Sequence, residues 1–133
     1  MLTKLRDFFL GLGSKDFEQD QNEAMLTLLV WVMQADGKIA AGESSKINDF
    51  IEAVNWNSDL PATAFVKEVS ARIATIESGE LSEEDLMKEC SSKLKGSDIR
   101  YKAVKICHEL AKADNYFDNA EKHLLKLFSK TLI

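Results

Sequence analysis

Four carboxylates stand at matching places in two short stretches of the sequence. QADGKIAAGE carries Asp36 and Glu43, and KADNYFDNAE carries Asp114 and Glu121, with seven positions from aspartate to glutamate in each. Carboxylates from two facing turns, with carbonyl oxygens and water, are ligands for a hard divalent cation. The four residues are therefore a candidate metal site, and their all-oxygen chemistry favours Ca²⁺ or Mg²⁺ over Zn²⁺.

A second interpretation gives the same carboxylates a purely structural role. The sequence DNAE fits a capping box, with Asp118 as the N-cap and Glu121 reaching back from the third helical position. Aspartates in turns commonly bond to nearby backbone amides. The first stretch fits less well, because Ala40 has no side chain that can cap a helix. Neither stretch is an EF-hand, whose loop needs a glutamate at its twelfth position. The residues alone leave both interpretations open.

The two stretches belong to a longer internal repeat. Residues 25–54 align with residues 103–132 at a shift of 78 positions, and apolar residues coincide, as Phe50 does with Phe128. Each copy has the pattern of a helix, a tight turn that contains aspartate, and a second helix that opens with glutamate. We therefore expect two pseudo-symmetric helical hairpins. If their axis passes near the turns, the four carboxylates converge.

The elements that must position these turns are predicted to be helices. A single proline, six glycines and 45% hydrophobic residues favour helices over strands, and no segment alternates convincingly at period two. A length of 133 residues suits one domain, 1–133, with one core. The pattern predicts an all-α fold with seven helices, at about residues 1–13, 17–36, 41–54, 61–79, 82–95, 99–113 and 119–132. Asp59 is the expected N-cap of the fourth helix and Ser82 that of the fifth.

The first predicted helix, residues 1–13, is amphipathic. Leucine and phenylalanine side chains fall on one of its sides, at Leu2, Leu5, Phe8, Phe9 and Leu12. The favoured interpretation is a helix docked on the core, and the alternative is a surface contact with a membrane or a partner. The segment is too short to span a bilayer and lacks the features of a signal peptide.

Composition restricts the classes of partner and compartment. The net charge is −5 and there is no basic tract, which argues against nucleic acid. Lys122, Lys126 and Lys130 are read as a solvated helix face. Cys90 and Cys107 are read as small apolar residues rather than a disulfide, which favours a reducing cytoplasm.

No known catalytic pattern is found in the chain. Position 105 is lysine and position 120 alanine, so neither His108 nor His123 has the glutamate of a di-iron bundle three residues before it. Zinc spacings, phosphate-binding glycine loops and nucleophile elbows are missing as well. We therefore expect a protein that is not an enzyme. If the acidic turns are only caps, the expected role is a protein–protein adaptor that uses its first helix or the polar loop around Trp56.

The two acidic stretches resemble the doubled Ala-Asp-Gly-x-Ile-x-x-x-Glu signature of the TerB-like domain family. ADGKIAAGE is followed by INDFI, and ADNYFDNAE by LLKLF, so the resemblance covers roughly residues 20–133. The family includes tellurite-resistance TerB proteins, and a relative forms the N-terminal part of a membrane-anchored DnaJ-type co-chaperone. Asn115 replaces the second glycine and Ala40 a frequent serine or aspartate, which affects ion affinity more than fold.

The resemblance implies an all-helical domain whose acidic turns are suspected of holding a metal ion. Carried over to this sequence, those positions are Asp36, Glu43, Asp114 and Glu121. It also implies a stress-response module without enzymatic activity, associated with tellurite resistance and with protein complexes near the inner membrane face. We therefore expect a cytoplasmic protein that binds a divalent cation and unidentified protein partners.

Overall fold

Seven α-helices make up most of the described chain. The computed structural model describes residues 3–35, 41–112 and 119–133, and the side chains of these except at positions 3–4 and 41–44. The helices are α1 Thr3–Gly11, α2 Gln19–Met33, α3 Ala41–Ala53, α4 Ala62–Ser78, α5 Glu83–Lys93, α6 Ser97–Lys112 and α7 Asn119–Leu132, with a 3-10 turn at Ser14–Asp16. The described residues contain no strand, and the predicted all-α fold is confirmed.

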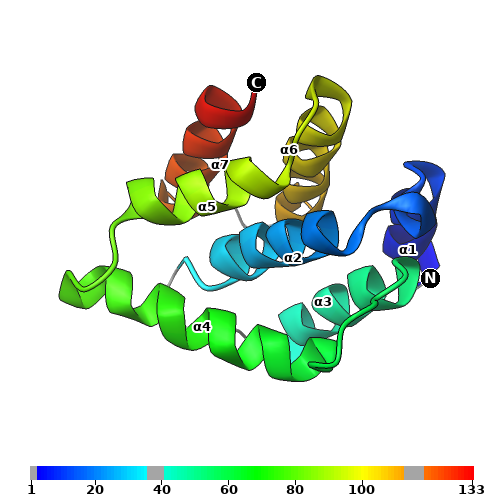
Figure 1. The fold of residues 1–133 in the computed structure, drawn as a ribbon, viewed down its shortest axis with the longest axis horizontal. Helices are drawn as coiled ribbons and strands as arrows, with labels where there is room; N and C mark the ends of the chain where they lie inside the picture. Colours follow the sequence, from blue (N-terminus) through cyan, green and yellow to red (C-terminus); the bar gives the residue numbers. More distant parts are fainter. Residues whose placement is uncertain (1–2, 36–40, 113–118) are drawn as a thin grey trace.

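Helix α2 is the central element. Every residue from Met25 to Met33 is buried, as expected for a segment that is apolar on almost every side. Helices α3, α4, α5, α6 and α7 all pack against it. Figure 1 shows α2 running between α4 on one side and α5, α6 and α7 on the other. A capping box between Glu18 and Gln21 starts the helix, which the sequence analysis did not identify.

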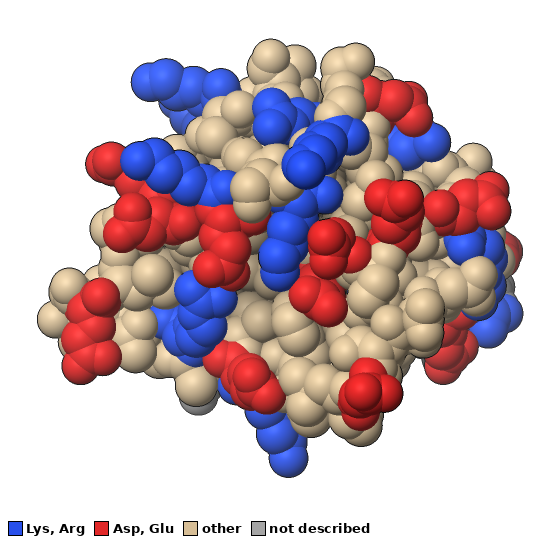
Figure 2. Space-filling view, in the orientation of Figure 1, with Lys and Arg blue, Asp and Glu red and all other residues tan. Residues whose placement is uncertain are grey.

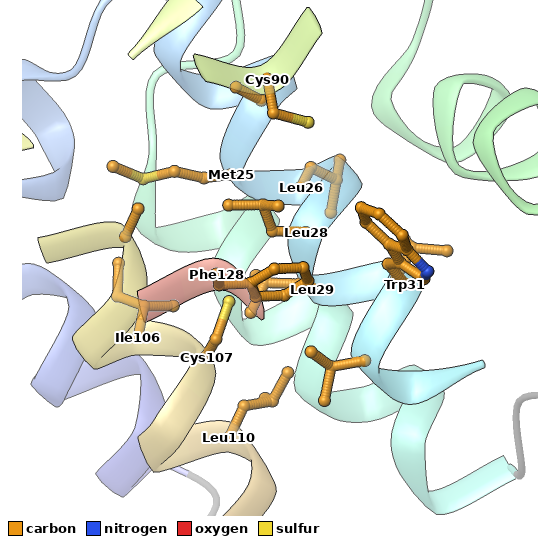
Figure 3. Close-up of a cluster of buried hydrophobic side chains, with 14 of the residues drawn as sticks. Met25, Leu26, Leu28, Leu29, Trp31, Cys90, Ile106, Cys107, Leu110 and Phe128 are labelled. Atoms are coloured by element: carbon orange, nitrogen blue, oxygen red, sulfur yellow. The ribbon is translucent and has the colours of Figure 1, made fainter. Parts of the chain in front are cut away.

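The buried positions of the two repeat copies coincide. Four pairs related by the 78-residue shift are all at most 4% exposed: Leu28 with Ile106, Val32 with Leu110, Ile47 with Leu125, and Phe50 with Phe128. The copies also meet in the core, where the rings of Trp31 and Phe128 lie 5.3 Å apart. Figure 3 shows Ile106, Leu110 and Phe128 of the second copy facing the side chains of α2. The repeat in the sequence is therefore a repeat in the core.

The N-terminal segment closes one side of the first hairpin. Helix α1 packs against α3, and the ring of Phe9, which is fully buried, lies edge-on to Phe50 at 5.4 Å. The buried Ser14 hydroxyl donates to the carbonyl of Ala53, and Lys15 Nζ donates to the carbonyl of Glu52 at 2.9 Å. These bonds satisfy carbonyls that the end of α3 leaves without helical partners. The prediction that the first helix docks on the core is confirmed.

One predicted cap is correct and the other is wrong. Ser82 Oγ accepts a hydrogen bond from the amide of Asp85 at 3.0 Å, as expected for the N-cap of α5. The N-cap of α4, in contrast, is Pro61 and not Asp59. Pro61 is itself extended, with a ψ of 148°, so the helix begins only at Ala62. Asp59 is then two positions too early to cap it.

Two other features have structural roles. The Trp56 ring is half-buried, packs against Phe65 at 5.3 Å between centroids, and donates its Nε1 hydrogen to the carbonyl of Leu60. Cys90 and Cys107 are buried free thiols, as predicted. Burial raises the pKa of Cys90 to about 12, and it raises the pKa of Cys107 further, so both remain protonated at neutral pH.

Candidate functional site

Glu121 is the predicted ligand whose side chain the structure describes. It is the third residue of α7 and only 6% exposed, and it is the one buried carboxylate among the described side chains. Glutamate is almost never buried to this extent unless it is paired or coordinates a metal. The positive end of the α7 dipole favours a negative charge at this position. Its burial therefore distinguishes Glu121 from the other described acidic residues, which are accessible to solvent.

The other three predicted ligands are not described. Asp36 and Asp114 lie outside the described residues. Glu43 belongs to the first turn of α3, but its side chain lies outside the description. Among the described side chains, no three His, Cys, Asp or Glu residues come together as metal ligands, and that set holds only Glu121 of the four. Convergence of the four carboxylates thus stays a prediction.

The described flanks of the two acidic turns line one surface cavity. This cavity of about 410 Å³ lies between the end of α2, the C-terminal part of α4 and the starts of α5 and α7. Ala35, the residue before Asp36, lines it, and so does Ala120, the residue before Glu121. Ala35, which precedes the first acidic turn, and Ala120, which follows the second, are therefore neighbours across a single cavity.

An amide and a hydroxyl fix the α2 end of this cavity. Gln34, just before the first turn, is buried and donates from Nε2 to the Ser70 carbonyl at 2.9 Å. Its Oε1 in turn accepts the Ser70 hydroxyl hydrogen at 2.5 Å. Because both groups of the Gln34 amide are satisfied, the end of α2 is held to α4. A buried polar residue is thus used to position the helix end from which the first turn departs.

Two acidic side chains and a histidine line the outer part of the cavity. His123 Nε2 lies 3.0 Å from Glu83 Oε1, which joins α7 to the first turn of α5, and Glu77 of α4 lines the same cavity. The floor is apolar and includes Trp31 and Leu124. Glu83 and Glu77 were not predicted, because they come from helices outside the repeat. Glu77 directly precedes the acidic segment 78–85 and Glu83 lies within it, and this acidic composition was their only signal.

Comparison with known families identifies the chain. The family model for tellurite resistance protein TerB matches residues 22–132. The chain belongs to the TerB family. Neither the curated proteins nor the solved structures compared with the chain gave a match. The predicted family is thus confirmed, and with it an association with tellurite resistance at the level of the family.

The match to the TerB family model includes both hairpins, and the N-terminal segment lies before it. It begins within the first turn of α2 and ends at the last residue of α7, so it contains both copies of the repeat. Helix α1 and the 3-10 turn precede the match, yet they pack against α3. No described helix is both long and apolar enough to cross a membrane.

Proposed function

We propose that this TerB-family protein is a cytoplasmic, non-enzymatic stress-response module that binds one divalent cation and engages protein partners. The cation ligands are Asp36, Glu43, Asp114 and Glu121, with Ca²⁺ or Mg²⁺ preferred to Zn²⁺. The ion neutralises the clustered carboxylates and holds the two turns together. Two buried free thiols fit a reducing compartment.

The burial of Glu121 carries this proposal. A carboxylate that only caps a helix end commonly remains accessible to water, as do the exposed Glu84 and Asp85 in the first turn of α5. Glu121 instead lies in the interior at the start of α7. A bound cation compensates a buried negative charge directly, which is one of the two ways in which proteins retain such charges.

The shared cavity is the second support. A cation that joins two turns requires the turns to be neighbours. Ala35 and Ala120, which directly precede Asp36 and Glu121 in the sequence, line the same cavity. Gln34, fixed to Ser70, limits the movement of the end of α2 relative to α4. Preorganised oxygen ligands on rigid helix ends reduce the entropy that is lost on ion binding.

One observation favours the alternative function, a protein–protein adaptor whose acidic residues are helix caps. Helix α7 begins at Asn119, so Glu121 is its third residue, which is the position of the glutamate in a capping box. The same chain uses a box of this kind at Glu18 and Gln21. In this alternative the burial of Glu121 reflects a bond to the backbone that starts α7.

Substitution Glu121→Gln separates the two functions. Glutamine serves in a capping box almost as glutamate does, but a neutral amide is a poor ligand for a divalent cation. We expect the wild-type protein, freed of metal with a chelator, to release or absorb heat on titration with Ca²⁺ or Mg²⁺. At about 100 times Kd the ion stabilises the fold by about 2.7 kcal/mol, which raises Tm by roughly 10 °C.

The variant and its control define the outcomes. Glu121→Gln should keep the Tm of the metal-free wild type and lose the ion-dependent rise. Glu84→Gln, an exposed carboxylate in the first turn of α5, should keep that rise. If neither heat nor a change in Tm is observed for the wild type with Ca²⁺, Mg²⁺ or Zn²⁺, the cation site is wrong and the adaptor remains.

A further inference from the structure

A basic groove runs along the outer side of α7. It has a volume of about 850 Å³, and its lining comes from α7 except for His108 of α6. Lys122, Lys126 and Lys130 line it, together with His123, and the described lining residues include no Asp or Glu. The uniform sign is unexpected in a protein whose net charge is −5. The helix face that the sequence predicts to be solvated therefore lines a groove whose charged residues are all basic.

The three lysines form a regular row. They follow one another at every fourth position, so they lie on one side of α7 with a rise of about 6 Å between successive residues. Neither Lys126 nor Lys130 has an ion pair with any residue in the described part of the chain. Leu125 of the core lies at the base of the groove.

The row is absent from the first copy of the repeat. A shift of 78 positions takes Lys122, Lys126 and Lys130 to Ser44, Asn48 and Glu52. Glu52 forms an ion pair with Arg6 of α1, at 3.2 Å, which is one of the contacts that join α1 to α3. The buried positions are common to both copies and the lysine row is not. Formation of the hairpin therefore does not require these lysines.

We infer that this groove docks an acidic α-helix of a partner protein, with carboxylates at every fourth position. Such a helix repeats its charges with the same rise of about 6 Å, so Lys126 and Lys130 can each face a carboxylate. A concave groove also matches a rod better than it matches the flat surface of a bilayer. The inference specifies the partner for the partner-binding part of the proposed function and is independent of the cation site.

The charge of the whole molecule favours a short acidic helix over an extended polyanion. Figure 2 shows Lys and Arg side chains gathered at the top of one face, and Asp and Glu side chains interspersed with further Lys and Arg over the rest of it. The chain has a net charge of −5, so a nucleic acid or an anionic membrane that extends beyond the groove meets an excess of carboxylates, which repels it. A helix of a few turns contacts the groove alone.

A designed peptide tests the inference with the full-length protein. The probe is a labelled helical peptide of about 16 residues with glutamate at every fourth position, long enough to retain helicity. Its control has the same composition with the glutamates distributed around the helix. Fluorescence anisotropy is measured in a chelator, so that failure of peptide binding and failure of the cation site can be told apart. We expect saturable binding of the probe, at least about tenfold tighter than that of the control, because only the probe aligns its charges.

Charge reversal locates the binding site. Lys126→Glu/Lys130→Glu should weaken probe binding by at least about tenfold, since two attractions become repulsions. Lys67→Glu/Lys95→Glu changes the net charge equally at two exposed lysines outside the groove and should leave the affinity within about twofold. Equal binding of the two peptides, or no effect of the groove reversal, would overturn the inference. So would tighter binding of a single-stranded oligonucleotide or of phosphatidylglycerol vesicles at the same lysines.

Discussion

The hairpins α2–α3 and α6–α7 share their buried positions but differ in what surrounds them. In the first hairpin α2 is buried along its whole apolar segment, and α1 covers α3. In the second, α6 exposes Tyr101 and α7 exposes Lys126 and Lys130. One copy of the repeat thus forms the centre of the fold, whereas the other presents a surface. The residues that the two copies share form the core, and the residues that differ determine what each copy presents at the surface.

The largest expected effect tests the equivalence of the two copies. Phe50 and Phe128 are related by the repeat shift, both are fully buried, and each packs against another ring, Phe9 or Trp31. Phe50→Ala and Phe128→Ala should each lower the free energy of unfolding by about 3–5 kcal/mol, because each leaves a cavity in the core. Urea denaturation measures both. A loss below about 1 kcal/mol for either variant would show that its copy does not contribute equally to the core.

The next effect concerns the two buried thiols, one inside the second copy of the repeat and one outside both copies. Cys107 stands where the first copy has Leu29, and Cys90 lies nearby in α5. Burial raises the folded-state pKa of Cys90 to about 12, while an unfolded thiol ionises near its ordinary value. The contribution of the protonated Cys90 thiol to the free energy of unfolding is therefore fully present below the pKa of the unfolded state. Above that pKa the free energy of unfolding falls by about 1.4 kcal/mol per pH unit, until the pH reaches the pKa of the folded state.

Urea denaturation between pH 8 and pH 11 measures this slope. In Cys90→Ala the unfolding free energy should decline less steeply with pH, because the contribution of one thiol to the slope is lost. At pH 8 the wild-type thiols should react with iodoacetamide only when the protein unfolds. Rapid labelling of the native protein at pH 8 would contradict the burial of these side chains.

A smaller effect tests the closure of the first hairpin. The buried Ser14 hydroxyl donates to the Ala53 carbonyl at the end of α3, and the second hairpin has no equivalent of this segment before α6. Ser14→Ala should destabilise the protein by about 1–2 kcal/mol, because a buried carbonyl loses a partner. Ser92→Ala is the matched control on an exposed surface, where the hydroxyl bonds only within its own helix. A similar loss in the two variants would show that the Ser14 bond is not special.

The smallest effect concerns the basic row of the second hairpin. Lys126→Glu/Lys130→Glu should lower the free energy of unfolding by about 1 kcal/mol or less, because both side chains are exposed and have no ion pair with the described residues. The main cost is the replacement of the basic residue in the last turn of α7 by an acidic one. Thermal melting at moderate salt measures the change. A loss above about 2 kcal/mol would indicate that the row stabilises α7 rather than presenting a surface.

Sequence patterns predicted what depends on periodicity and local chemistry. The repeat placed the paired core residues such as Phe50 and Phe128, and the Ser-x-x-Asp pattern placed the cap at Ser82. The Asp59 cap was wrong, because the extended conformation of Pro61 outweighs the capping preference of aspartate two positions earlier.

Contacts between distant segments were beyond these patterns. Gln34 and Ser70 are 36 residues apart, and no local signal in the sequence pairs an amide with a hydroxyl at that distance. The basic groove needs His108 of α6 beside the lysines of α7, and concavity is a property of packed helices rather than of spacing. Of the candidate metal site, sequence chemistry supplied the residue types, while the burial of Glu121 came only from the fold.

A crystal structure of the protein grown with Ca²⁺ decides whether the acidic turns hold a cation. We expect a density peak between residues 36–43 and 114–121, with Glu121 and at least one carboxylate of the first turn at about 2.3–2.6 Å from it. The opposite result is an ordered pair of turns without an ion, in which Glu121 accepts a hydrogen bond from the backbone at the start of α7. That result would contradict the cation site and reduce the acidic turns to helix caps.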